Sequence, residues 1–129
     1  MQHTEKMIDV RDELIRLGHD AFVTDLHKPF IGKTDEEKEE IKLHQKYTKD
    51  AIREFWNAMQ GADAVLVLNI DKNKIRNYIG GNTFLEMGFA HILNQKIFLY
   101  NLIPEIPYYK TEIIAMKPTI INQDLALIK

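Results

Sequence analysis

The stretch from Gly80 to Phe89, which reads GGNTFLEMGF, holds the residues of this chain best suited to chemistry. It follows an apolar, strand-like run at residues 62–70 and a polar, basic loop. Two glycines let the backbone turn sharply and let a ligand approach closely. Asn82 or Thr83 is expected to cap a helix whose first turn holds Glu86, and the positive end of that helix would keep the carboxylate ionised. An ionised carboxylate at the carboxyl end of a strand is a candidate nucleophile.

The same residues have a second interpretation that involves no ligand. Thr83 and Glu86 have the spacing of a capping box, in which the glutamate side chain satisfies a backbone N–H at the start of the helix. In that arrangement Glu86 would fold back onto its own main chain and would only stabilise the helix.

The composition is that of one globular domain. The chain has 129 residues, of which 45% are hydrophobic and 28% charged, and its formal net charge is −2, so it is long enough to bury a core. This charge balance predicts no binding to nucleic-acid polymers. No apolar run approaches the ~20 residues that span a bilayer. Residues 1–10 do not resemble a signal peptide, so we expect no membrane partner and a cytoplasmic location.

Cysteine and histidine usage limits the chemistry further. The chain contains no cysteine, which excludes disulfides, thiolate metal sites and cysteine nucleophiles. Its five histidines show no recognisable metal-ligand spacing. We therefore expect neither a metal nor a cofactor.

The hydrophobic pattern predicts alternating helices and strands. Helices are expected at residues 4–17, 34–59, 83–93 and 111–117, and strands at residues 20–24, 64–68, 96–100 and 119–121. Thr34 and Glu37 form a capping-box pattern at the start of the second helix. The apolar stripe is thin between Ile41 and Ile52, which predicts a break in that helix or a helix lying partly in solvent.

The alternation predicts an α/β fold: a Rossmann-like or flavodoxin-like three-layer sandwich with a mainly parallel sheet of four to five strands, in one domain over residues 1–129. The uninterrupted apolar runs at 64–68 and 96–100 are typical of strands buried on both faces. A doubly wound domain normally opens with a strand, so either this sheet has four strands or its first strand is missing. Ligands of such sheets bind beyond the carboxyl ends of strands, where Asp71 and residues 80–86 are expected.

The segment from Ala62 to Tyr100 resembles the nucleoside 2-deoxyribosyltransferase superfamily, which includes the deoxynucleoside-monophosphate N-glycosidases. The matching residues lie in the glycine-rich turn, the helix and the next strand: Gly81, Thr83, Glu86, Gly88, Ala90, Lys96 and Ile97. The resemblance implies a five-stranded Rossmann-like sheet and a homo-oligomer, a dimer or larger, in which a neighbouring subunit completes each site. It also implies that Glu86 attacks the anomeric carbon of a nucleoside or nucleotide. The cytokinin-type riboside-monophosphate hydrolases carry a related motif.

Two features depart from this family. Relatives open with a strand and a Gly-Ser-type turn that touches the ligand, and only the residues after that turn, including His3, have counterparts here. Relatives also carry an aspartate in the helix before the central strand, where this chain has Phe55. Glu54 is adjacent but would point about 100° away on a helix. The acid is therefore Glu54 after a small shift in alignment, or Asp71, or it is absent.

Cleavage of an N-glycosidic bond passes through an oxocarbenium-like transition state, for which a carboxylate and a nearby acid are suited. Glu86 would stabilise or trap the sugar cation. Asp71 or Glu54 would orient Glu86 or protonate the leaving base, although Asp71 equally fits a turn residue. The basic loop at residues 72–76 suits either a phosphorylated ligand or ordinary surface charge. The substrate-binding residues expected beside these acids are Gly80, Gly81, Asn82, Thr83, Tyr78 and His3.

Three functions are consistent with these features. The first is cleavage or transfer of an N-glycosidic bond, as a nucleoside 2-deoxyribosyltransferase or a nucleoside-monophosphate N-glycosidase. The second is a non-catalytic nucleotide-binding or sensor module on the same fold, which the replacement of the expected aspartate by Phe55 favours. The third is a domain that only mediates subunit contacts.

Overall fold

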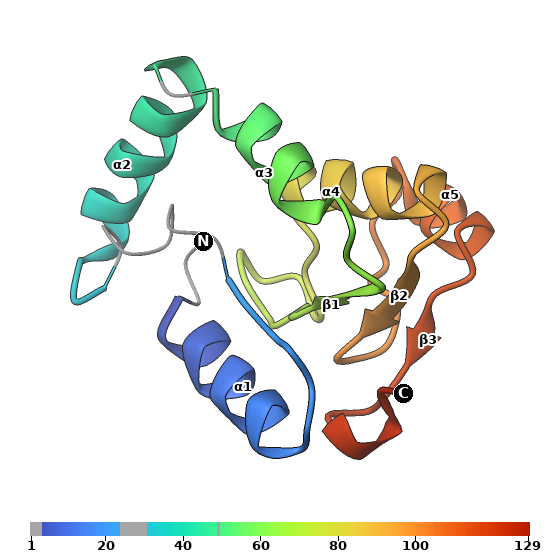
Figure 1. The fold of residues 1–129 in the computed structure, drawn as a ribbon. Coiled ribbons are helices and arrows are strands. Elements are labelled where there is room, and N and C mark those ends of the chain that lie inside the picture. The colour runs from blue at the N-terminus through green and yellow to red at the C-terminus, as the bar shows by residue number, and fades with distance from the viewer. Residues whose placement is uncertain (1–3, 24–30, 49) are drawn as a thin grey trace. The chain divides into compact units, whose positions relative to one another are not determined.

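The computed structural model describes residues 4–23, 31–48 and 50–129 (Figure 1). The chain divides into two compact units, Met1–Ala58 and Met59–Lys129, and each is described by itself. The first unit is helical where it is described, whereas the second contains a parallel sheet. The candidate residues of the glycine-rich segment all belong to the second unit.

Helices α1 (Thr4–Arg16) and α2 (Asp35–Thr48) lie in the first unit, and α3 (Ala51–Met59) begins there. The capping box predicted at the second helix is confirmed. The Thr34 N–H donates to Glu37 Oε1 at 3.1 Å, and the Glu37 N–H donates to Thr34 Oγ1 at 3.2 Å. These two bonds satisfy backbone donors that have no acceptor within the helix, and so they define where α2 begins.

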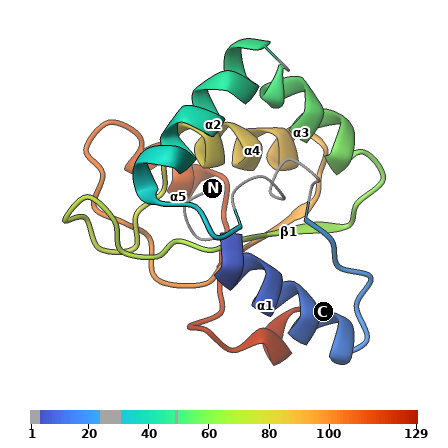
Figure 2. The same cartoon turned by 90° about the vertical axis from the view of Figure 1, so that its left-hand side faces the viewer.

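The break predicted inside the second helix is also confirmed. The helical pattern at 34–59 is divided between two separate helices, α2 and α3 (Figure 2). Asp50, directly before α3, has a left-handed φ of 49°, which a continuous helix does not allow. Its carbonyl oxygen accepts the Glu54 N–H at 3.1 Å and so starts the new helix.

The strand predicted at residues 20–24 is wrong for residues 20–23, which adopt no regular structure, and Thr24 lies outside the described residues. Phe22, in the middle of this pattern, is 59% exposed. A strand needs a neighbouring strand for its backbone N–H and C=O groups. The part of this unit that the structure describes contains helices but no strand to provide them.

The sheet of the second unit has three parallel strands in the order β1-β2-β3 among the described residues. The strands are β1 (Ala64–Val67), β2 (Lys96–Leu99) and β3 (Thr119–Ile120). Helix α4 (Gly81–Ile92) connects β1 to β2, and α5 (Lys110–Ala115) connects β2 to β3. The short 3-10 helix η2 (Leu125–Leu127) follows the sheet. The mixed α/β class with a parallel sheet is confirmed.

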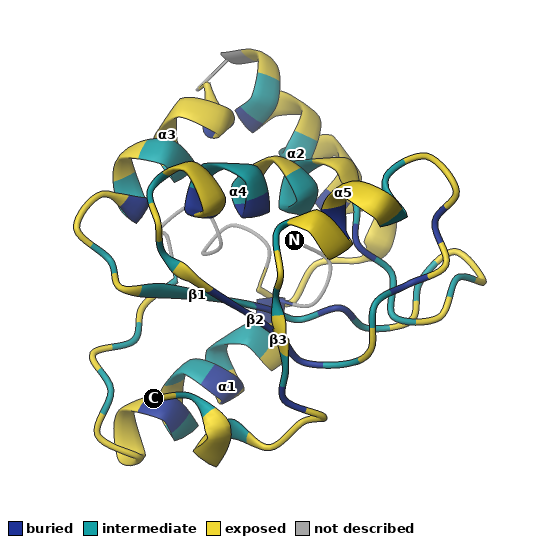
Figure 3. Ribbon diagram, turned by 90° about the vertical axis from the view of Figure 1, so that its right-hand side faces the viewer, coloured by how far each residue is buried: buried dark blue, intermediate teal, exposed yellow. Residues whose placement is uncertain are grey.

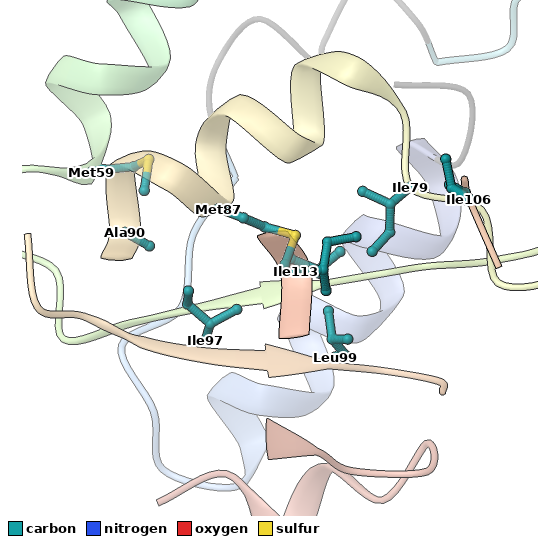
Figure 4. Close-up of a cluster of buried hydrophobic side chains, with 9 residues drawn as sticks. Met59, Ile79, Met87, Ala90, Ile97, Leu99, Ile106 and Ile113 are labelled. Atoms are coloured by element: carbon teal, nitrogen blue, oxygen red, sulfur yellow. The ribbon is translucent and has the colours of Figure 1, made fainter. Parts of the chain in front are cut away.

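Apolar side chains cover both faces of this sheet, as the uninterrupted strand patterns predicted. Alternate residues of β2 point to opposite faces, so Ile97 and Leu99 lie under α4 and α5, whereas Phe98 faces the other way. The core under the two helices is formed by Met59, Val67, Ile79, Met87, Ala90, Ile97, Leu99, Ile106 and Ile113 (Figure 4). On the opposite face, Leu125 and Ile128 pack against a cluster formed by Phe98, Tyr100 and Ile121. The most buried parts of the strands lie at the middle of the unit (Figure 3).

Candidate active site

The start of α4 differs from the sequence-based prediction. The helix begins at Gly81, and Gly80 is its N-cap, with extended backbone angles (φ −79°, ψ 171°) and no side-chain cap bond. The Gly80 carbonyl accepts the Phe84 N–H at 2.9 Å, which is the first helical bond. The prediction that Asn82 or Thr83 caps the helix is therefore wrong, because an N-cap has extended backbone and these residues are already helical.

This start places Glu86 in the second turn of α4 rather than the first. The capping box with Thr83 does not form, because its N-cap position is taken by Gly80. Within the described residues, no hydrogen bond or ion pair reaches the Glu86 carboxyl group. The side chain is half-buried. Glu86 therefore does not cap its own helix by folding back onto the main chain.

Burial raises the pKa of Glu86 from 4.5 to about 7. Removing water from around a carboxyl group disfavours its charged form, and no donor of the described residues offsets this effect. The prediction that the helix end keeps Glu86 ionised is therefore wrong. The influence of a helix end falls off within the first turn, and Glu86 lies beyond it. Near pH 7 the protonated and ionised forms of Glu86 are therefore present in similar amounts.

The two glycines do not act through an unusual turn, since neither has a positive φ. Gly80 instead allows another side chain to approach the backbone closely. A Cβ atom on Gly80 would lie 3.3 Å from Tyr78 Cε1, so the Tyr78 ring packs directly on this residue. A Cβ atom on Gly81 would meet no atom of the described residues within 4 Å. The N–H groups of the first turn of α4 have no acceptor within the helix.

Asp71 has the turn role that was one of its two interpretations. It is exposed, and its Oδ1 accepts the Asn77 N–H at 2.8 Å, which closes the loop between them. Lys72, the next residue, holds its Nζ 5.5 Å from the centre of the Tyr78 ring. The hydrogen bond found for the Asp71 side chain in the described part of the chain thus goes to the main chain of its own loop. Lys72, in the basic loop, therefore contacts Tyr78, whose ring packs on Gly80.

The other two predicted residues, Glu54 and His3, belong to the first unit. Glu54 is exposed on α3 and belongs to the first unit, so it is not placed with respect to Glu86. Phe55, beside it, is half-buried. His3 lies outside the described residues. From the predicted set, the second unit therefore assembles Tyr78, the two glycines, Asn82, Thr83 and Glu86 on one continuous segment.

A group of carboxamides at the carboxyl ends of the strands was missed. Asn69 is fully buried, and its Oδ1 accepts the Asn101 N–H at 2.8 Å. Its Nδ2 donates to the carbonyl oxygens of Asn101 and Leu102, both at 2.9 Å. Gln123 Nε2 donates to Asn101 Oδ1 at 2.9 Å. A signal was present in the sequence, because an asparagine follows each of the apolar runs VLVL and IFLY.

Tyr109 was missed as well, although it contacts the segment that carries the candidate residues. Its hydroxyl donates to the Ile79 carbonyl oxygen, directly before Gly80. Its ring stacks on the Phe84 ring, with 4.5 Å between the ring centres. These partners are far from Tyr109 in sequence, so no local pattern could have indicated the contact.

Residues 4–23, 31–48 and 50–129 contain no cluster of three or more His, Asp or Glu side chains that could hold a metal ion. No helix in these ranges combines the length and the apolar character needed to cross a bilayer.

Comparisons with known proteins provide no further identification: no family model, no curated protein and no solved structure matches this chain. The resemblance of Ala62–Tyr100 to the nucleoside 2-deoxyribosyltransferases therefore supports a proposal about function and does not establish a family.

Proposed function

We propose that this protein cleaves or transfers the N-glycosidic bond of a nucleoside or nucleotide, with Glu86 as its catalytic carboxylate. The observation that carries the proposal is the state of Glu86: it is half-buried, it has no partner among the described residues, and its pKa is about 7. Perturbed carboxyl groups of this kind are typical of catalytic sites. The choice of a nucleoside as substrate rests on the resemblance of Ala62–Tyr100.

The reaction would use the ionised form of Glu86. Its carboxylate attacks the anomeric carbon, the bond from that carbon to the base nitrogen breaks, and the base leaves with the electron pair and takes up a proton. Asp71, which lies in the same unit as Glu86, is the candidate donor of this proton. Water then displaces the carboxylate in a hydrolase, and a second base does so in a transferase. How well the site excludes water decides between these outcomes.

Substrate binding would use the start of α4. The N–H groups and side chains of Asn82 and Thr83, with the backbone of Gly80 and Gly81, would bind sugar hydroxyls or a 5′-phosphate, because the amino end of a helix favours negative charge. Tyr78 would stack on the base. No metal or cofactor is required by this chemistry.

The resemblance and the composition together support three wider proposals. We infer that the fold is a Rossmann-like or flavodoxin-like three-layer sandwich with a mainly parallel sheet of four to five strands. We infer that the protein acts in the cytoplasm. We also infer that it forms a homo-oligomer, in which a neighbouring subunit completes each site.

The direct test is to incubate the purified protein with a panel of deoxynucleosides and their monophosphates, with and without an acceptor base. Base release or exchange is expected from the wild type and is expected to be lost in Glu86→Gln. Glu112→Gln is the matched control, because Glu112 is an exposed carboxylate on α5. Failure of the wild type to release or exchange any base would reject the proposal.

Calorimetry with the same nucleosides and nucleotides separates the remaining alternatives. Binding without turnover would favour the non-catalytic nucleotide-binding module. No binding at all would favour a domain that mediates subunit contacts.

A further inference from the structure

The segment between β2 and α5, residues 101–109, is held at both of its ends. At the first end, Asn69 exchanges hydrogen bonds with Asn101 in both directions: it accepts the Asn101 N–H, and Asn101 Nδ2 donates to the Asn69 carbonyl oxygen at 3.0 Å. Because Asn69 is fully buried and bonded on both its oxygen and its nitrogen, this attachment is rigid.

The middle of the segment is stiff and packed. Pro104 is buried, and Pro107 restricts the backbone a few residues later. Ile106 belongs to the core under α4 and α5, together with Met87 and Leu99. A segment with two prolines and a core side chain has little freedom to move relative to the sheet.

The second end of the segment contacts the residues on either side of Gly80 and Gly81, which are called the Gly80–Gly81 turn below. The Tyr109 hydroxyl donates to the Ile79 carbonyl, and the ring stacks on Phe84, the fourth residue of α4, with 4.5 Å between the ring centres. Tyr109 therefore holds the turn on both sides of Gly80 and Gly81. Burial, and then the neighbouring Tyr78, raise the pKa of Tyr109, so its hydroxyl keeps its proton as a hydrogen-bond donor.

We propose that Tyr109 is a positioning residue that fixes the Gly80–Gly81 turn, and with it the donor N–H groups at the start of α4. The segment 101–109 connects the buried Asn69 rigidly to this turn. The consequence for substrate binding rests on the proposed function. The effect on the turn itself does not, so the two can be tested separately.

The test compares Tyr109→Phe with Tyr108→Phe in the full chain. Tyr109→Phe keeps the ring and removes only the hydroxyl that reaches Ile79. Tyr108 is the matched control, because it is the adjacent tyrosine and is 89% exposed. Two measurements are made: amide hydrogen exchange across the Gly80–Gly81 turn by NMR, and KM and kcat for any nucleoside that the wild type turns over.

Faster exchange of the turn amides is expected in Tyr109→Phe and not in Tyr108→Phe. KM is expected to rise about fivefold, the equivalent of one neutral hydrogen bond, with little change in kcat, because the turn binds substrate and transition state alike. A merely structural role would lower the thermal midpoint and leave KM unchanged.

Equal exchange in the two variants, or an unchanged KM in Tyr109→Phe, would overturn the inference. If the wild type turns over no nucleoside, the proposed function fails, and the exchange comparison still decides the role of Tyr109.

Discussion

Glu86→Gln is expected to stabilise the protein in a pH-dependent way. Glutamine keeps the shape of the side chain but cannot ionise. In the folded protein the pKa of Glu86 is about 7, against an ordinary value of 4.5. The folded state therefore binds this proton more tightly than the unfolded state does, by about 3 kcal/mol at 1.4 kcal/mol for each tenfold change. The free energy of unfolding is therefore lower by this amount once the carboxyl group is ionised in both states.

The sign of the effect follows from proton binding. Between pH 4.5 and about 7 the folded state holds more of this proton than the unfolded state, so this group makes the free energy of unfolding fall as pH rises. Below pH 4.5 Glu86 is neutral in both states, and Glu86→Gln should be as stable as the wild type. At pH 8 the variant should be more stable by up to about 3 kcal/mol.

Urea unfolding at pH 4, 6 and 8 measures this difference. Other carboxyl groups, such as those of Glu5, Glu13 and Glu37, have lowered pKa values because of hydrogen bonds, and they change the wild type and the variant equally. Glu112→Gln is the matched variant at an exposed position of α5. A difference between Glu86→Gln and wild type that is constant from pH 4 to 8, or that is negative at pH 8, would refute the burial-driven pKa of Glu86.

The remaining predictions concern the reaction and the residues around it. If Glu86 reacts as a carboxylate, kcat/KM should rise with pH and level off above about 7, with about one tenth of the maximum at pH 6; a rate that falls through pH 7 would make Glu86 the acid instead. Gly81→Ala should stabilise α4 by about 0.5–1 kcal/mol in thermal unfolding, whereas Gly80→Ala should be less stable than Gly81→Ala by about 1 kcal/mol because its Cβ presses on Tyr78; equal stabilities would contradict this contact. Asn69→Ala should lower the free energy of unfolding by about 3 kcal/mol in urea, since it leaves buried backbone groups without partners, and a loss below about 1 kcal/mol would contradict the network.

Much of the secondary structure could be predicted from sequence because its causes are local. The capping pair Thr34 and Glu37 specified where α2 begins, and the thin apolar stripe specified where the helical pattern is interrupted. Uninterrupted apolar runs specified two strands buried on both faces. The strand at 20–24 failed for residues 20–23, because strand formation depends on a partner that the pattern itself does not contain.

The features of the candidate site also fall into those that local sequence determines and those that depend on the tertiary structure. The sequence by itself determined that Glu86 lies on a helix after an apolar strand and a pair of glycines, since each of these features is written in neighbouring residues. Only the tertiary structure decided that Gly80 caps this helix, that burial raises the pKa of Glu86, and that Tyr109 bonds to Ile79. The physical reason is that solvent exclusion and long-range hydrogen bonds depend on which distant segments pack around a side chain.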